Sequence, residues 1–279
     1  MTGVIHEEGR EEQTLAQDII SSGRYSLDPD YSRVFDQRGE FGPGSIFEIN
    51  HVDITNGLEG TVGTTYQNSR ATWGYGFNCP TQNLYDAFEA NDPRRDATII
   101  EGGETITGPQ GNTETVEVIG ACSANGPSGY LNEKVWLPAA RQPSGPRKGP
   151  TNRRVIRYAH VLLWHAEAAN EAGNPQAALT SLNKVRARAR DDDADPSNDP
   201  DGVLPDITTT TQSELRDIIW HEQRVEFAME YQRFFNLVRQ GRTDRLVDAG
   251  FEEGVNERFP IPQEQLDQGT ALEQNPGYL

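Results

Sequence analysis

Two apolar stretches joined by Gly173-Asn174-Pro175 constrain the fold of this chain more than any other part of its sequence. Residues 153–172 and 175–190 both repeat apolar side chains at the three- and four-residue spacing of a helix that buries one face. Gly173 can end the first helix in a left-handed conformation, and Pro175 can begin the second helix at its first position. The sequence therefore predicts two antiparallel helices, a hairpin of the tetratricopeptide type, whose repeat is about 34 residues long.

Helical spacing continues in only part of the remaining chain. Further helices are predicted at residues 7–22, at 82–90 and, capped by Thr211 or Ser213, up to about residue 240. Alternating or β-branched residues predict short strands at 45–49, 97–100 and 115–119, and the last 30 residues are expected to be coil with turns.

The predicted fold class is mainly α, with long loops and short strands. One complete helical hairpin is present, so residues 1–27 are interpreted as a remnant of a helical-repeat region. Residues 28–152 are expected to form a loop-rich region with short strands, and residues 153–279 a C-terminal helical region.

The charge of the chain argues against one large class of function. Asp and Glu number 43 and Lys and Arg number 25, which gives a formal net charge of −18. Binding to nucleic acid needs clustered cations, so no nucleic-acid partner is expected. Only three of the basic residues are lysine. This acidic, lysine-poor composition predicts a protein adapted to high salt, where self-repulsion is screened; an acidic protein from an arginine-rich genome is the alternative.

The printed sequence shows no segment that would enter a membrane. No run approaches 18 consecutive apolar residues, and the first residues lack the basic and apolar segments of a signal peptide. We therefore expect neither a membrane-spanning helix nor a lipid-attachment cysteine in this chain.

Three partial motifs fall short of a metal or cofactor site. The segment 221–225 (HEQRV) starts like a zinc-protease helix, but Val225 stands where the second histidine would be. The acidic run at 191–201 has part of a calcium-loop pattern, although Thr208 stands where the closing carboxylate would be; a solvated acidic loop is favoured. Residues 74–76 (GYG) lack the third glycine of a dinucleotide fingerprint. No metal and no cofactor is predicted.

Two further features leave alternatives open. Cys79 and Cys122 could form a disulfide in an oxidising compartment or remain two buried thiols. Glu222, Glu226 and Glu230 are spaced four apart on a predicted helix, where like charges repel unless something compensates them. Structural ion pairs with arginines of the hairpin are favoured over a catalytic carboxylate pair, so no catalytic residue is predicted.

The loop at residues 66–77 carries the side chains expected of a sugar site. Flat aromatic rings suit the apolar faces of sugars, while amide and guanidinium groups hydrogen-bond their hydroxyls. The predicted ligand-binding residues are Trp73 and Tyr75, with Tyr66, Asn68 and Arg70 beside them. In the alternative interpretation, Trp73 and Phe77 anchor a long loop to the core.

Several segments occur in the order found in one known family. They are residues 80–94 (PTQNLYDAFEANDPR), 157–168 (RYAHVLLWHAEA), 183–189 (NKVRARA), 222–239 (EQRVEFAMEYQRFFNLVR), 260–263 (PIPQ) and 274–278 (QNPGY). Together, over residues 80–278, they resemble the SusD/RagB family. His160, Gln223 and Asn236 depart from the family's usual Asp, Arg and Asp, which alters polar groups between helices without affecting the expected fold.

The resemblance implies a non-enzymatic, glycan-binding lipoprotein on the outer face of an outer membrane. Such a protein delivers oligosaccharide to a SusC-like TonB-dependent transporter, and its aromatic arc comes partly from the region that corresponds to residues 60–80 here. The family motifs also imply a structural scaffold of buried ion pairs and hydrogen bonds, formed by Arg157, Glu167, Arg186, Glu222, Arg224, Glu226 and Arg233. A broken buried pair costs several kcal/mol, so Arg224→Ala is expected to cost about 3 kcal/mol or more.

The chain resembles the C-terminal half of the family only, because members are roughly twice as long and begin with a lipoprotein signal. Membrane association would therefore depend on a lipid anchor that this sequence lacks. Three alternatives remain: a helical-repeat interaction module or peptide-binding lid without sugar binding, a carboxylate hydrolase, and a truncated reading frame whose exposed apolar helix faces would dimerise or aggregate.

Overall fold

The computed structural model describes residues 2–52, 60–107, 113–118, 122, 129–191, 202–269 and 271–278. The chain divides into two compact units, Met1–Met229 and Glu230–Leu279. Within the described residues, no helix is both long and apolar enough to cross a membrane.

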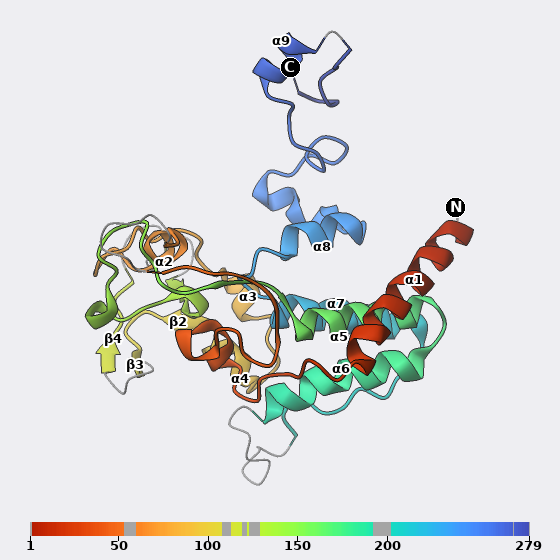
Figure 1. Cartoon of the computed structure of the whole chain (residues 1–279), viewed down its shortest axis with the longest axis horizontal. Helices are drawn as coiled ribbons and strands as arrows, with labels where there is room; N and C mark the ends of the chain where they lie inside the picture. Colours follow the sequence, from red (N-terminus) through yellow and green to blue (C-terminus); the bar gives the residue numbers. More distant parts are fainter. Residues whose placement is uncertain are drawn as a thin grey trace. The chain divides into compact units, whose positions relative to one another are not determined.

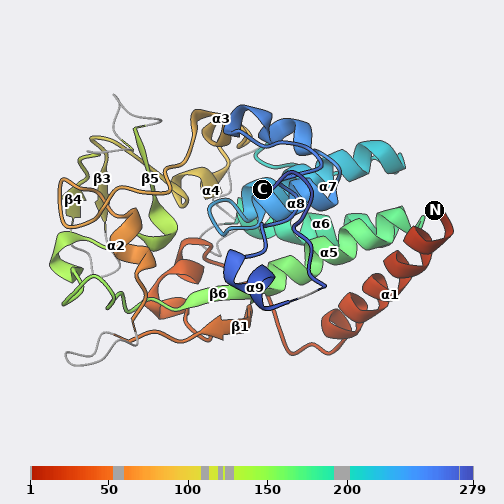
Figure 2. The ribbon, with the colours of Figure 1, turned by 90° about the horizontal axis from the view of Figure 1, so that it is seen from above.

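Four helices form the main core of the first unit. They are α1 (Thr2–Ser21), α5 (Tyr158–Glu171), α6 (Pro175–Arg190) and α7 (Gln212–Glu226), and α5 packs against each of the other three (Figures 1 and 2). The helical hairpin predicted from the Gly-Asn-Pro turn is confirmed. Gly173 has a φ of 79°, and the side chain of Asn174 accepts a hydrogen bond from the Ala177 amide at the start of α6. Leu162, Leu182 and Ile219 are fully buried between the helices.

The first helix of the hairpin begins later than its apolar spacing predicts. Residues Arg153–Arg157 form strand β6, which pairs antiparallel with β1 (Ser45–Ile49). The prediction of a strand at 45–49 is thus confirmed, and that of a helix from residue 153 is wrong. The reason is tertiary: β1 offers β6 a partner strand, and Glu48 of β1 pairs with the buried guanidinium of Arg154, Oε1 lying 2.8 Å from Nε.

The loop-rich part of the first unit consists of short elements. These are η1 (Ser32–Phe35), η2 (Gln37–Gly39), α2 (Gly63–Gln67), α3 (Gln82–Tyr85), α4 (Pro93–Asp96), β2 (Ile99–Glu101), β3 (Thr105–Thr107), β4 (Thr113–Thr115), β5 (Tyr130–Asn132), η3 (Glu133–Val135) and η4 (Ala139–Arg141). Strand β2 pairs antiparallel with β5, and β3 with β4. The predicted helix at 82–90 is shortened to four residues. Of the strand expected at 115–119, Thr115 lies in β4, residues 116–118 lie in no strand, and residue 119 is outside the described residues.

A disulfide between Cys79 and Cys122 closes the small core of this loop-rich part. Cys122 is fully buried with Ile100, Leu131 and Trp136, and Cys79 packs against the same cluster. The structure therefore resolves the alternative that the sequence left open in favour of the bridge.

The long helix predicted over 213–240 is broken, because α7 ends at Glu226. The main-chain carbonyl of Glu226 accepts hydrogen bonds from the Tyr31 hydroxyl at 2.8 Å, Lys134 Nζ at 3.2 Å and Arg157 Nη2 at 3.2 Å. These donors occupy the carbonyl that a continuing helix would use four residues later. Met229, with a φ of 63°, then leaves the helical region of backbone space.

The second unit contains α8 (Arg233–Arg239), the 3₁₀ segment η5 (Thr243–Ala249) and α9 (Gln263–Gln268). The coil expected over the last 30 residues is therefore interrupted by one short helix. Hydrogen bonds join the two closing motif segments. Gln274 Oε1 accepts from the Ile261 amide and Gln274 Nε2 donates to the Ile261 carbonyl, while Asn275 Nδ2 donates to the Phe259 carbonyl at 2.7 Å.

Candidate functional site

Three exposed rings gather where α2 and the following loop come together. The rings of Tyr66 and Tyr75 are stacked with centroids 5.4 Å apart, and Phe77 lies edge-on to both at 6.2 and 6.3 Å. The three side chains keep 42%, 40% and 47% of their surface exposed. We call Tyr66, Tyr75 and Phe77 the aromatic cluster.

Main-chain hydrogen bonds hold the aromatic cluster in place. The Phe77 amide donates to the Tyr66 carbonyl at 2.8 Å, and the Tyr75 amide donates to the Thr65 carbonyl at 2.9 Å. The loop thus runs back along α2, which brings rings nine and eleven residues apart in sequence into contact. Because these hydrogen bonds join main-chain atoms, replacing one aromatic side chain is expected to leave them in place.

Arg70 borders the aromatic cluster with an exposed guanidinium group. Its Nε donates to the Tyr75 carbonyl at 2.8 Å, and its Cζ lies 5.8 Å from the centre of the Phe77 ring. The bond from Nε therefore positions the guanidinium group. The Nη1 and Nη2 groups take no part in that bond, so they can donate to a ligand hydroxyl.

Asn68 and Trp73 occupy less accessible positions than the other predicted ligand-binding residues. Asn68 is 1% exposed, and its Nδ2 donates to the Leu137 carbonyl at 3.0 Å. A Cβ atom on Gly74 would lie 2.2 Å from the Asn68 carbonyl oxygen, so only glycine fits there. Trp73 is half-buried, and its buried indole nitrogen has no acceptor among the described residues. Asn68 therefore holds the loop against Leu137, and ligand binding by Asn68 and by Trp73 stays a prediction.

The sequence predicts Phe77 only as a possible anchor, whereas the structure exposes it beside the two tyrosines. An alternation signal was present, since residues 75 and 77 are both aromatic and separated by glycine. Gln67 and the disulfide support the same loop: Gln67 Oε1 accepts from Asn78 Nδ2 at 2.6 Å and from Asn132 Nδ2 at 3.0 Å, and Cys79 follows directly.

The glutamates of α7 lie in a buried ionic network. Arg94 is fully buried; its Nη2 lies 2.8 Å from Asp92 Oδ2, and its Nη1 bonds Glu222 and lies 3.1 Å from Glu226 Oε2. Arg186 Nη1 lies 2.9 Å from Glu222 Oε2. The spacing of four on α7 therefore brings Glu222 and Glu226 to one face, as predicted, and arginines from other segments neutralise them. The prediction is wrong for Glu230, because α7 ends at Glu226.

Glu226 is held in its ionised form by this network. Burial by itself raises the pKa of the Glu226 carboxyl, but Arg188, Arg157 and Arg94 outweigh burial and hold the pKa well below its usual range. Arg188 Nη2 and Arg157 Nη1 lie 2.6 and 3.0 Å from Glu226 Oε1. A carboxylate enclosed in this way cannot deliver a proton near neutral pH, which favours the structural over the catalytic interpretation of this pair.

The remaining predicted scaffold residues lie elsewhere. Glu167 accepts hydrogen bonds from Trp220 Nε1 and Gln223 Nε2, both at 2.7 Å. Arg224 is half-buried and donates to the main-chain and side-chain oxygens of Asn83 at the surface. Arg233 is half-buried at the start of α8 in the second unit.

The arginine at the centre of the network is Arg94, which sequence reasoning noted only as part of a family segment. The sequence carries a short-range indication of its position, because Asp92 and Pro93 are typical residues for the start of a helix. In the structure they begin α4, and the Asp92 side chain accepts a hydrogen bond from the Arg94 amide.

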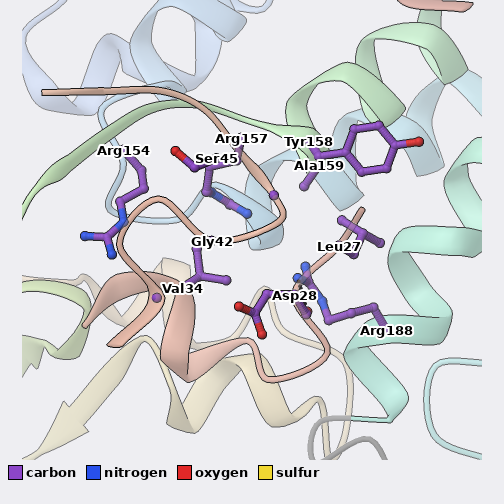
Figure 3. A pocket seen from close by; sticks show the side chains of 12 residues that line it. Leu27, Asp28, Val34, Gly42, Ser45, Arg154, Arg157, Tyr158, Ala159 and Arg188 are labelled. Atoms are coloured by element: carbon purple, nitrogen blue, oxygen red, sulfur yellow. Dashed lines mark hydrogen bonds between the residues drawn. The ribbon is translucent and has the colours of Figure 1, made fainter. Parts of the chain in front are cut away.

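A small pocket beside the network is shown in Figure 3. Asp28, Arg157 and Arg188 line it together with the glycine-rich segment around Gly42. Its volume of about 20 Å³ is enough for a water molecule and too small for a sugar ring. This part of the molecule is therefore packed as interior.

Metal binding has no support in the described part of the chain. No group of three or more His, Cys, Asp or Glu side chains is arranged there to hold an ion. The partial calcium-loop pattern at Ser197, Asp199 and Asp201 lies outside the described residues.

Comparison with known proteins gives a consistent result. A model of the SusD family matches residues 43–278. The SusD-like protein P2 of Formosa agariphila is 27% identical over 273 residues, covering 90% of this chain and 52% of the relative. A laminarin-binding SusD-like protein of known structure superposes with a TM-score of 0.75 at 26% identity, covering 99% of this chain and 60% of that one.

A second solved structure is surface glycan-binding protein A from Bacteroides thetaiotaomicron in complex with laminarihexaose. It superposes with a TM-score of 0.71 at 25% identity, covering 98% of this chain and 61% of that one. This chain spans about half the length of the curated relative.

Proposed function

This chain belongs to the SusD family, and from that premise we propose that it binds an oligosaccharide at the cell surface through the aromatic cluster. The observation that carries the proposal is the stacked, exposed arrangement of Tyr66, Tyr75 and Phe77, with Arg70 beside them. Three large rings held at the surface by main-chain bonds are typical of a binding surface, because a loop that only needed an anchor would bury them.

The chemistry of the cluster suits a sugar chain. The apolar faces of pyranose rings pack on exposed aromatic rings, and the hydroxyls around each sugar find donors and acceptors in Arg70 and the two tyrosine hydroxyls. The surface is open, so it fits several successive sugar units better than one enclosed ring. The ligand class that we favour is a β-glucan of the laminarin type, because two of the similar solved structures are described with laminarin or laminarihexaose.

The proposed partner and location follow the family. We propose delivery of the bound glycan to a SusC-like TonB-dependent transporter at the outer membrane. The alternative, a lid or helical-repeat module that binds protein or peptide without sugar, predicts recovery of the transporter regardless of glycan. Binding without cleavage also predicts that no reducing ends are released from laminarin, whereas a carboxylate hydrolase would release them.

The test compares Tyr75→Ala with Phe47→Ala in titrations with laminarihexaose. Both wild-type rings are exposed, at 40% and 52%, but Phe47 lies on β1, away from the cluster residues in the sequence and outside their ring contacts. We expect Tyr75→Ala to weaken binding at least tenfold and Phe47→Ala to leave it unchanged, with both variants keeping the wild-type circular dichroism. Equal affinities of the folded Tyr75→Ala variant and the wild type would contradict the assignment. Trp73→Ala is a poorer test, because Trp73 is half-buried and its loss would also disturb the loop.

A further inference from the structure

The first unit contains a cavity that the aromatic cluster does not use. Its volume is about 390 Å³, within the range of small-molecule pockets. It lies between η1 and η2 on one side and the segments that carry Ala97, β3 and η3 on the other. None of the three cluster rings lines it, but the two places are joined, since the Leu137 carbonyl that accepts from Asn68 belongs to a residue of the cavity wall.

Glu133 places a carboxyl group of unusual protonation behaviour among the residues that line the cavity. The structure provides no hydrogen-bond or ion-pair partner for its partly buried carboxyl among the described residues. Burial, and then the carboxylates of Glu104 and Asp96, raise the pKa of Glu133 to about 8. Near neutral pH this carboxyl group carries a proton, and it can therefore both donate and accept a hydrogen bond, as a neutral amide does.

The charged groups of the wall are already engaged. Arg38 bonds Asp36 through Nε at 2.7 Å. The Lys134 ammonium group donates to the Glu226 carbonyl and lies 4.4 Å from the centre of the Phe35 ring. Among the described lining residues the cavity thus presents no uncompensated charge, which disfavours an ionic ligand and favours a neutral one.

The remaining wall supplies a ring surface and hydroxyl groups. Phe35 and Trp136 line the cavity, and the indole nitrogen of Trp136 has no acceptor among the residues that the structure describes. The hydroxyl-bearing residues Ser32, Thr107 and Thr151 also line it, and the Ser32 hydroxyl donates to Asp30 Oδ1 at 2.7 Å. Aromatic side chains, hydroxyls and a neutral carboxyl together match the mixed apolar and polar faces of one sugar ring.

We propose that this cavity is a second ligand site, which takes a single neutral pyranose unit independently of the aromatic cluster. The cluster holds a chain along an open surface, whereas the cavity takes one ring between Trp136, Phe35 and Glu133. The sugar class is shared with the proposed function, but the site stands on its own cavity and would bind whether or not the cluster does.

The experiment uses saturation-transfer NMR with D-glucose and laminaribiose, which detects millimolar binding, beside titrations with laminarihexaose. Ala97→Phe fills the cavity without removing a polar group, and Ala90→Phe, at an exposed position outside the lining, is its matched control. Glu133→Gln keeps a neutral donor and acceptor, whereas Glu133→Leu removes both. Thermal melts identify any variant that fails to fold.

We expect Ala97→Phe and Glu133→Leu each to weaken the glucose signal at least tenfold, and Ala90→Phe and Glu133→Gln to keep it within about twofold. Tyr75→Ala is expected to weaken laminarihexaose and to leave glucose unaffected. The cavity proposal is overturned if wild type shows no saturable glucose or laminaribiose signal, or if folded Ala97→Phe and Glu133→Leu both bind as wild type does. If Tyr75→Ala abolished the binding of every sugar, the cavity proposal would also be overturned, and the aromatic cluster would be supported. If Tyr75→Ala kept laminarihexaose binding, only the assignment of the aromatic cluster would be contradicted.

Discussion

Arg157 binds Glu226 at two chemically different points: its Nη1 lies 3.0 Å from the carboxylate Oε1, and its Nη2 donates to the main-chain carbonyl at 3.2 Å. The first contact neutralises a buried charge, and the second satisfies a carbonyl at the end of α7. Because Arg157 is also the last residue of β6 and the N-cap of α5, one side chain couples the strand pair, the hairpin and the end of α7. The buried network therefore determines where helices end as well as how they pack.

Loss of Arg94 is expected to destabilise the first unit strongly. Arg94→Met would leave Asp92, Glu222 and Glu226 with less compensation in a buried site, which typically costs about 3–5 kcal/mol. Arg216→Met is the matched control, because the Arg216–Glu171 pair is about 30% exposed and such pairs contribute about 1 kcal/mol or less. Denaturant unfolding measures the free energy of unfolding of both variants. Equal decreases would show that the buried network stabilises the fold no more than a surface ion pair does.

Arg224 is expected to be far less important than the family motif suggests. The sequence predicts a cost of about 3 kcal/mol or more for Arg224→Ala, whereas its surface hydrogen bonds to Asn83 predict about 1 kcal/mol. The two values are separable in the same unfolding series. A loss as large as that of Arg94→Met would restore the sequence-based prediction.

The Cys79–Cys122 bridge is expected to stabilise the loop that carries the aromatic cluster. For a sequence separation of 43 residues, the chain-entropy account gives about 4 kcal/mol. Reductant should therefore lower the melting temperature of the wild type and weaken laminarihexaose binding. The double variant Cys79→Ser with Cys122→Ser should melt at the reduced wild-type temperature and not respond to reductant. A wild type that is indifferent to reductant would contradict this prediction.

Glu133 is expected to make stability fall as the pH rises from about 4.5 to about 8. Its folded-state pKa is raised to about 8 from a usual value of 4.5, so in this interval the folded state binds more protons than the unfolded state. The free energy of unfolding then decreases by up to about 1.4 kcal/mol per pH unit and levels off above pH 8. Glu133→Gln lacks the titrating group, so the wild type minus Glu133→Gln difference should follow this curve. A flat difference between pH 5 and pH 8 would argue against the shifted pKa.

Adaptation to high salt remains a prediction of the composition, with its net charge of −18. If self-repulsion limits stability, molar KCl should raise the melting temperature, because the screening length shrinks from about 10 Å at 0.1 M salt to about 3 Å at 1 M. Sorbitol at equal osmolality controls for general solute effects. No increase in KCl beyond that in sorbitol would favour an acidic protein from an arginine-rich genome.

The sequence predicted the elements whose signals are local. The turn at Gly173-Asn174-Pro175, the strand at 45–49 and helix α6 follow from caps, φ preferences and side-chain periodicity within a few residues. The loop at 66–77 was also identified as a sugar-binding candidate from its residue types alone.

Only the tertiary structure decided how distant residues meet. Arg94 and Glu222 are 128 residues apart, and the donors that end α7 at Glu226 come from Tyr31, Lys134 and Arg157. Likewise, the exposure of Phe77 and the burial of Asn68 depend on how the loop folds back along α2 and against Leu137. Periodicity and capping act over one helical turn, whereas burial and charge compensation depend on which segments pack together, and that choice is made by the whole core.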